Sequence, residues 1–300
     1  MSRRYAILDV FTDRPLAGNP LAVVLDCEGL DDARMQAIAA EFNLSETVFV
    51  LPPERPVHTA AIRIFTPARE LPFAGHPTVG TAVLLGLERA ASGLGNGEMV
   101  LVLEEKAGPI RCGVSLRSDR LGHAIFDLPR LPAEGGAAPD REALAAALTL
   151  IPAEIGFENH RPTIFDAGVA FHIVPVRDLA TMAKARTNTA VWQSAFGADA
   201  AFLYCRETME SGRHFHARMF APGFGISEDP ATGSAVAALA GVIAKFDQPP
   251  GGSHNYLVEQ GFEMGRPSLI GLEIDMDGGA VVEGRIAGDA VVVARGTLDA

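Results

Sequence analysis

Two residues that can bind substrates or move protons stand at matching places in a repeated motif. The stretch His76-Pro77-Thr78-Val79-Gly80-Thr81-Ala82 is matched, 153 residues later, by Asp229-Pro230-Ala231-Thr232-Gly233-Ser234-Ala235. A second pair, RIFTP at 63–67 and RMFAP at 218–222, repeats with an offset of 155 residues. The copies share Pro, Gly and small hydroxyl residues, which set backbone shape, and they differ at the polar residue before the proline. This pattern predicts two similar halves that together build one functional site.

Each of the two prolines is expected to open a helix, because proline is favoured at the first helical position. His76 and Asp229 are then predicted to be N-caps. The free N–H groups and the dipole of a helix start attract negative charge, so two such starts would bind a substrate carboxylate without a lysine. Taken alone, Asp229 is equally consistent with a structural cap, and a lone histidine is more often a core or surface residue than a catalyst.

Glu46 is a third candidate for proton transfer. It lies between an amphipathic helical pattern ending at Phe42 and an apolar strand pattern. Partial burial at such an edge would raise its pKa towards the range of a general base or acid. A solvated glutamate at a strand end is the alternative interpretation, and the same two interpretations apply to Glu70 and Glu228.

Other catalytic patterns are weaker. His214-Phe215-His216 puts two imidazoles on one strand face, as a metal pair requires, but no third ligand stands at a suitable spacing. A packed or surface strand is favoured, and no metal site is predicted. Ser45 or Ser234 with His76 and Asp229 supplies the residues of a serine hydrolase, but the chain has no G-x-S-x-G elbow.

Composition and charge limit the class of protein. The chain has 300 residues, 48% hydrophobic and 21% charged, which fits two domains. A formal charge of −12 argues against nucleic-acid and anionic-membrane partners. The N-terminus does not resemble a signal peptide, and the most apolar stretch, 235–244, is too short to cross a bilayer. Three scattered cysteines fit neither a disulfide framework nor a zinc site, so a cytoplasmic protein with reduced thiols is expected.

Hydrophobic periodicity predicts strands in both halves, each with a central helix. A Pro/Gly/Ala-rich stretch at 130–139 is the candidate linker region, and the predicted domains are 1–122 and 123–300. No G-x-G-x-x-G follows a strand and no P-loop is present. The predicted fold class is therefore α+β rather than an alternating nucleotide-binding sheet. The expected helices are 31–42, 77–87, 140–148 and 230–246, and the expected strands include 5–11, 21–25, 46–51, 60–65, 99–103, 110–116, 124–128, 171–176, 200–204, 214–220, 269–275, 280–286 and 290–295.

Several of these strings together resemble one known family, the phenazine-biosynthesis PhzF-like proteins. The resemblance covers nearly the whole chain and implies a diaminopimelate-epimerase-like fold. That fold has two similar domains from an internal duplication, each a curved, mostly antiparallel sheet around a central helix, with the active site between them. The resemblance also implies a homodimer that uses no metal and no organic cofactor. The matching strings are Gly18-Asn19-Pro20, LSET at 44–47, FTPARELPFAGHPTVGTA at 65–82, EDPATGSA at 228–235, EQG at 259–261 and MGRPS at 264–268.

The best-understood activity in that family is isomerisation of trans-2,3-dihydro-3-hydroxyanthranilate, in which a glutamate moves a proton between ring carbons. The resemblance therefore implies a cofactor-independent isomerase acting on a small cyclic or unsaturated amino acid-like carboxylate. The residues that match the family's catalytic positions are Glu46, His76 and Asp229. Those that match positions lining the substrate or binding its carboxylate are Ser45, Gly75, Gly233 and Ser234.

Two other functions remain open. The same fold includes cofactor-independent racemases and epimerases that use one cysteine at each helix entrance. This chain has His76 and Asp229 there, and Cys112 and Cys205 do not stand at the repeat offset, so two-cysteine chemistry is disfavoured. An epimerase or racemase that uses other residues is the first alternative, and a non-catalytic small-molecule-binding homologue is the second.

Overall fold

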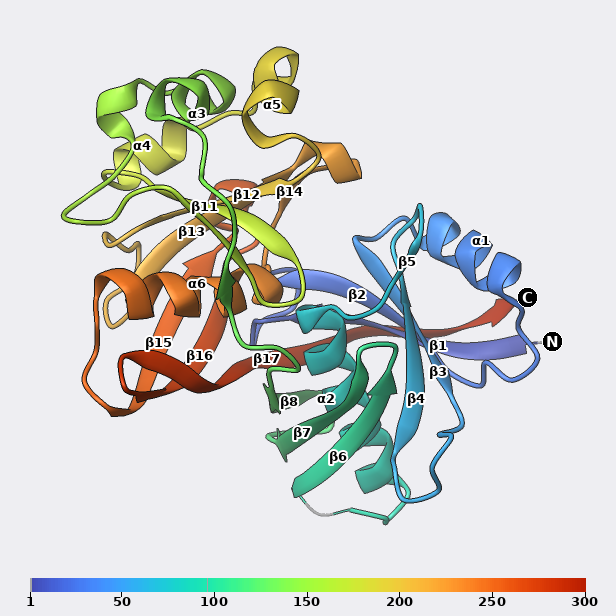
Figure 1. Ribbon diagram of the computed structural model, residues 1–300. Helices are drawn as coiled ribbons and strands as arrows, with labels where there is room; N and C mark the ends of the chain where they lie inside the picture. The colour runs from blue at the N-terminus through green and yellow to red at the C-terminus, as the bar shows by residue number, and fades with distance from the viewer. Residues whose placement is uncertain (1, 96) are drawn as a thin grey trace. The chain divides into compact units, whose positions relative to one another are not determined.

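The computed structural model describes residues 2–95 and 97–300, and the chain forms two compact units (Figure 1). The first unit contains Met1–Pro129 and Ile286–Ala300, and the second contains Arg130–Arg285. This division differs from the predicted domains 1–122 and 123–300. The last segment belongs to the first unit because β17 (Ala280–Asp299) pairs with β1 (Ser2–Val10) in an antiparallel ladder from Ser2↔Asp299 to Val10↔Ala290.

The first unit follows an ordered series of strand pairings. β1 pairs antiparallel with β2, β2 parallel with β3, β3 antiparallel with β4, and β4 both antiparallel with β5 and parallel with β6. β6 and β7, then β7 and β8, are antiparallel neighbours. The remaining elements of this unit are β2 (Asn19–Val24), α1 (Asp32–Phe42), β3 (Glu46–Leu51), β4 (Ala60–Phe65), β5 (Glu70–Leu71), α2 (Gly75–Ala91), β6 (Glu98–Glu105), β7 (Gly108–Leu116) and β8 (Leu121–Asp127).

The second unit repeats that series. β10 pairs antiparallel with β11, β11 parallel with β12, β12 antiparallel with β13, β13 antiparallel with β14 and parallel with β15, and β15 antiparallel with β16. The sequence repeat is therefore also a repeat of strand order. The elements are β9 (Ala133–Glu134), α3 (Arg141–Leu148), β10 (Thr163–Asp166), β11 (Ala170–Pro175), α4 (Leu179–Lys184), α5 (Thr189–Phe196), β12 (Ala200–Cys205), β13 (Phe215–Ala221), β14 (Ile226–Asp229), α6 (Gly233–Phe246), β15 (Gly252–Gln260) and β16 (Ser268–Asp277), with short 3-10 turns at Pro152–Glu154, Pro222–Phe224 and Phe262–Met264.

One helix in each unit packs against several strands of the same unit. α2 contacts β1, β2, β3, β6, β7 and β8, and α6 contacts β9, β10, β11 and β16. Close packing depends on glycine: a Cβ added at Gly80 would lie 2.6 Å from Leu21, and one added at Gly241 would lie 2.3 Å from the Phe165 ring. No helix of the described residues has the length and hydropathy needed to cross a membrane.

Candidate active site

His76 lies in the first turn of α2, not before it. The N-cap is Ala74, which has an extended backbone (φ −155°, ψ 139°) and no side-chain cap. The first helical hydrogen bond runs from the Thr78 N–H to the Ala74 carbonyl (3.3 Å), so the helix begins at Gly75. The prediction that His76 caps a helix opened by Pro77 is therefore wrong. The first-turn N–H groups of this helix belong to Gly75 and His76, since Pro77 has none.

His76 is buried between two polar side chains of the first unit. Its Nε2 lies 3.3 Å from Oε2 of Glu46, and its Nδ1 lies 3.4 Å from the amide nitrogen of Asn19. Burial lowers the pKa of His76 to about 3, so the ring is neutral at physiological pH. Because the Asn19 amide donates to Nδ1, the single ring proton lies on Nε2 and faces the Glu46 carboxyl group.

Adjacent strand starts bring these side chains to the same edge of the sheet. Glu46 is the first residue of β3, Asn19 is the first residue of β2, and the parallel register pairs Leu21 with Glu46. The Glu46 side chain is 13% exposed and Asn19 is fully buried. Gly18 sets the turn before Asn19: its φ is +63°, and an added Cβ would lie 2.3 Å from the carbonyl oxygen of Val10.

Sequence reasoning missed Asn19. The string Gly18-Asn19-Pro20 predicts a turn and is one of the strings that carry the family resemblance. A buried asparagine needs hydrogen-bond partners, but no spacing in the sequence identifies His76 as one. Ser45 is half-buried and directly precedes Glu46 in the chain, and Gly75 is buried directly before His76.

Asp229 ends a strand and lies three residues before the N-cap of the second central helix. It closes β14 by pairing with Met219 on β13, and the N-cap of α6 is Thr232. The N–H groups of Ala235 and Val236 both bond to the Thr232 carbonyl at 3.1 Å, so α6 begins at Gly233. The prediction that Asp229 caps a helix opened by Pro230 is therefore wrong, because the ladder with β13 holds Asp229 in an extended conformation.

A buried hydrogen-bond network of the second unit fixes Asp229. The Thr232 hydroxyl donates to Oδ2 of Asp229 (2.5 Å), and the Gln260 amide donates to the Asp229 carbonyl (2.7 Å) and to the Thr232 hydroxyl (3.1 Å). The Thr232 N–H donates in return to the Gln260 side-chain oxygen (3.1 Å). Gly233 is buried and Ser234 is half-buried in the first turn that follows. The candidate residues thus form one group around Glu46 and His76 in the first unit and another around Asp229 in the second.

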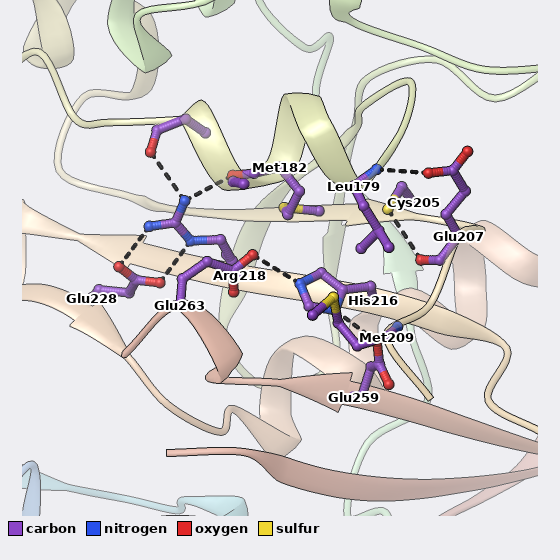
Figure 2. Close-up of polar contacts among 12 residues, drawn as sticks. Leu179, Met182, Cys205, Glu207, Met209, His216, Arg218, Glu228, Glu259 and Glu263 are labelled. Carbon is purple, nitrogen blue, oxygen red and sulfur yellow. Dashed lines mark hydrogen bonds and ion pairs between the residues drawn. The ribbon is translucent and has the colours of Figure 1, made fainter. Parts of the chain in front are cut away.

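Glu70 and Glu228, which sequence reasoning could not distinguish from Glu46, are partners of arginines. Glu70 binds Arg63 through two hydrogen bonds of 2.7 Å. Glu228 binds Arg218 in the same two-pronged way at 2.7 and 2.8 Å, as Figure 2 shows. These two carboxylates tie neighbouring strands together. Glu46 differs from these two carboxylates because its Oε2 lies 3.3 Å from Nε2 of His76.

The two histidines of the HFH string do not form a metal pair. His216 is fully buried and hydrogen-bonds to Glu259 (2.8 Å) and Glu263 (3.0 Å) (Figure 2). Burial by itself would lower its pKa, but the hydrogen bonds to the two carboxylates outweigh that effect and raise the pKa to about 9. His214 instead accepts a hydrogen bond from the Leu257 N–H. Among the described residues, no group of three potential ligands is placed to hold a metal.

The cysteines are poor candidates for proton transfer. All three are buried and free. Burial raises the pKa of the Cys27 and Cys205 thiols to about 12 and also raises that of Cys112. Because the thiolate is the reactive form, none of them is suited to take a proton from carbon near neutral pH.

The whole chain matches one family of proteins. A family model described as phenazine biosynthesis-like protein covers residues 8–296. A protein of Mesorhizobium japonicum, named an uncharacterized isomerase, is 51% identical and spans 99% of each chain. The trans-2,3-dihydro-3-hydroxyanthranilate isomerase of Pseudomonas aeruginosa is 34% identical and spans 98% of each chain. The crystal structure of a PhzF-family phenazine biosynthesis protein from Bacillus anthracis, 27% identical, superposes with a TM-score of 0.88 over 100% of both chains.

The chain belongs to the phenazine biosynthesis-like (PhzC-PhzF) family. Its relatives in that family are named isomerases, and the chain is an isomerase. The fold alone is shared more widely: a hydroxyproline epimerase from Agrobacterium vitis, 11% identical, has a TM-score of 0.66 and covers 99% of this chain and 91% of the epimerase.

Proposed function

We propose that the chain is a cofactor-independent isomerase that shifts a proton within a small cyclic or unsaturated amino acid-like carboxylate. Its substrate would resemble that of the P. aeruginosa relative, trans-2,3-dihydro-3-hydroxyanthranilate. The observation that carries the proposal is the contact between the partly exposed Glu46 carboxyl group and the buried, neutral His76 ring.

Glu46 is the proposed base. It takes a proton from one carbon of the substrate and returns it to another carbon on the same face. One movable carboxylate is sufficient for such a shift, whereas inversion at a single centre needs bases on both faces. The Nε2 atom of His76 lies 3.3 Å from Oε2 of Glu46, close enough for the ring to orient the carboxyl group. A buried imidazole with a pKa of about 3 neither takes nor gives a proton readily near neutral pH, so His76 is proposed to orient Glu46.

The remaining candidate residues are proposed to bind substrate. Asp229, oriented by Thr232 and Gln260, binds the amino or hydroxyl group. Helix starts attract anions through free N–H groups. Ser45 and Gly75 in the first unit, and Gly233 and Ser234 in the second, are proposed to line the substrate or bind its carboxylate, as the family resemblance implies.

Three further features are part of the proposal. The common order of strand pairings in the two units, together with the sequence repeat, supports an internal duplication. The resemblance to the family supports a homodimer, which light scattering coupled to size-exclusion chromatography would measure. The excess of negative charge supports a small-molecule partner rather than a nucleic acid or a membrane.

Proton NMR in D₂O tests the substrate and the base together. We expect the wild type to convert trans-2,3-dihydro-3-hydroxyanthranilate with deuterium incorporation, and Glu46→Gln to lose this activity by about 10²- to 10⁴-fold, the usual contribution of a general base. Glu41→Gln, at an exposed position in α1, is the matched control and should react like the wild type. A positional isomer as product supports the shift, and a stereoisomer supports the epimerase alternative. Full turnover by Glu46→Gln would remove Glu46 as the base.

A further inference from the structure

Glu105 and Gln260 occupy equivalent positions in the two units. Each is the last residue of the strand that follows the central helix, β6 or β15. The parallel registers agree: β4 pairs Ala60 with Leu103, and β13 pairs Phe215 with Val258. Ala60 and Leu103 each stand 155 residues before their counterparts in the second pair. Glu105 likewise stands 155 residues before Gln260.

Both residues hydrogen-bond to a threonine at the start of the central helix. Oε1 of Glu105 lies 2.7 Å from the Thr78 hydroxyl on α2, and the Gln260 amide lies 3.1 Å from the Thr232 hydroxyl at the N-cap of α6. In the second unit the order of donors is definite. The amide donates to the Thr232 hydroxyl, and that hydroxyl donates to the Asp229 carboxylate.

Counting the protons at Thr78 gives the same order of hydrogen-bond donors in the first unit. The Thr78 hydroxyl also lies 2.8 Å from the carbonyl oxygen of Ala74, which can only accept. A hydroxyl has one proton, so it cannot donate to both the carbonyl and a carboxylate. Both short contacts are satisfied only when Glu105 carries a proton and donates it to Thr78, which then donates to Ala74.

The surroundings of Glu105 favour its neutral form. It is buried, and its second oxygen, Oε2, has no hydrogen-bond partner among the described residues. Burial raises the pKa of Glu105 to about 8, against the lowering effect of the Thr78 hydrogen bond. The titratable group facing it is the Cys112 thiol on β7, whose pKa is itself raised by burial and by the carboxyl groups of Glu105 and Asp127. The adjacent cation, Lys106, binds Glu70 instead.

We propose that Glu105 acts as a protonated carboxylic acid, the counterpart of the Gln260 amide, and that it is a positioning residue for His76. Through Thr78 it fixes the Ala74 carbonyl, where the first turn of α2 closes, and His76 lies within that turn. The role in positioning a catalytic group rests on the proposed function, but the protonation state and its effect on His76 do not.

Infrared difference spectroscopy tests the protonation state. At neutral pH the wild type should show a C=O stretching band of a protonated carboxyl group that Glu105→Gln lacks. This band should disappear as the pH rises through about 8. Glu98→Gln, at the exposed beginning of β6, should keep the band. If the wild type and Glu105→Gln have the same spectrum in this region at pH 7, Glu105 is ionised and the proposal is overturned.

The pH dependence of urea unfolding provides a second test. Glu105 keeps its proton in the folded protein up to about pH 8 and loses it near the ordinary glutamate pKa of 4.5 in the unfolded chain. The wild type should therefore lose stability relative to Glu105→Gln as the pH rises from about 4.5 to 8. In this range, the slopes of the unfolding free energy against pH should differ by the equivalent of nearly one bound proton. Glu98→Gln should follow the wild type. Parallel curves for the wild type and Glu105→Gln would contradict the proposal.

The signal of the His76 ring tests positioning without a substrate. In protein labelled with ¹³C-histidine, Glu105→Gln should leave the His76 Cε1–H resonance unchanged at pH 7, and Glu105→Val should shift or broaden it. If Glu105→Val does not fold, the wild-type resonance still serves, because it should move with a midpoint near pH 8 while that of Glu105→Gln stays constant. An unchanged resonance in Glu105→Val, or a pH-independent one in the wild type, would show that Glu105 does not position His76. Since no substrate is used, this proposal and the proposed function fail separately.

Discussion

The two units place an arginine–glutamate pair at the same point of the fold but surround it differently. Arg63 on β4 binds Glu70 on β5, and Arg218 on β13 binds Glu228 on β14. The Arg63 side chain is 22% exposed and also binds the exposed Asp32. The Arg218 side chain is 3% exposed, and its remaining nitrogen donates to the carbonyls of Met182 and Ala185 (Figure 2). The same arginine–glutamate interaction is therefore close to solvent in the first unit and buried in the second.

A second pair of equivalent glutamates shows the same contrast. Glu104 accepts hydrogen bonds from the N–H groups of Glu54 and Arg55 and from His58. Glu259, 155 residues later, accepts from the N–H groups at 209 and 210, also at the repeat offset, and from His216. The second imidazole is fully buried and has Glu263 as an additional partner. The carboxylate and its two backbone donors are thus the same in both units, but the histidine comes from different positions of the repeat, His58 in one and His216 in the other.

Removing the carboxylate of each arginine pair should give the largest difference between the units. Glu228→Gln removes the carboxylate that hydrogen-bonds to the buried Arg218 and leaves the charge of Glu263 near it, which should cost up to about 3–5 kcal/mol in the free energy of unfolding. Glu70→Gln leaves Arg63 with Asp32 and solvent, so we expect about 1 kcal/mol or less. Urea unfolding of the two variants measures both values. Equal costs would show that burial of the arginine is not what separates the two sites.

His216 should make the free energy of unfolding depend on pH. Its pKa in the folded protein, about 9, is raised from the ordinary histidine value of 6.5. The stabilisation is therefore complete below about pH 6.5 and is lost as the pH rises through 9, amounting to roughly 3 kcal/mol. Unfolding measurements between pH 6 and pH 9.5 should show a loss that is larger in the wild type than in His216→Gln by this amount, because the contribution of Glu105 remains in the variant.

Glu263→Gln sharpens the same comparison. It leaves His216 with one carboxylate, as His58 has in the first unit. The variant should retain only part of the pH-dependent loss, because one of the two hydrogen bonds that raise the His216 pKa is gone. A variant that keeps the full pH dependence would mean that Glu259 alone holds the charge on His216.

Hydrophobic periodicity predicts most of the strands, but it does not predict β5, β9, β10, β14 or β15. The offset of 155 residues holds for Arg63 and Arg218 and for the strands that follow the central helices, and the pattern gave β3 and β4 with their observed bounds. The short helices α4 and α5 are not predicted, whereas the equally short α3 is, because its sequence is rich in the good helix formers alanine and leucine.

The helix starts were not predictable in the same way. Proline is tolerated both inside a first turn and before it, so Pro77 and Pro230 do not reveal which carbonyl accepts the first helical bond. In the structure that carbonyl belongs to Ala74 in one unit and to Thr232 in the other. Glu46 and His76 were singled out by residue type and by the family resemblance, and Glu105 was overlooked because a glutamate after an apolar strand is ordinarily exposed.

The smallest effect we expect concerns the two threonines at the helix starts. Thr78→Val and Thr232→Val each remove one hydroxyl from a buried network, which should cost about 1–2 kcal/mol at neutral pH. The two costs should differ in their pH dependence. When Glu105 is ionised, the Thr78 hydroxyl can turn to donate to the carboxylate, which is the influence that lowers the Glu105 pKa. Without that hydroxyl, the part of the stability loss that comes from Glu105 continues above pH 8, whereas in the wild type this part is complete there.

At Thr232 the neighbouring side chain is the Gln260 amide, which does not titrate. The cost of Thr232→Val should therefore stay constant from pH 5 to pH 9, while the cost of Thr78→Val increases above pH 8. Urea unfolding of both variants at pH 5, 7 and 9, beside the wild type, measures the difference. Two costs that stay constant over this range would mean that the Glu105 carboxyl group does not change its charge between pH 5 and pH 9, which contradicts a titration near pH 8.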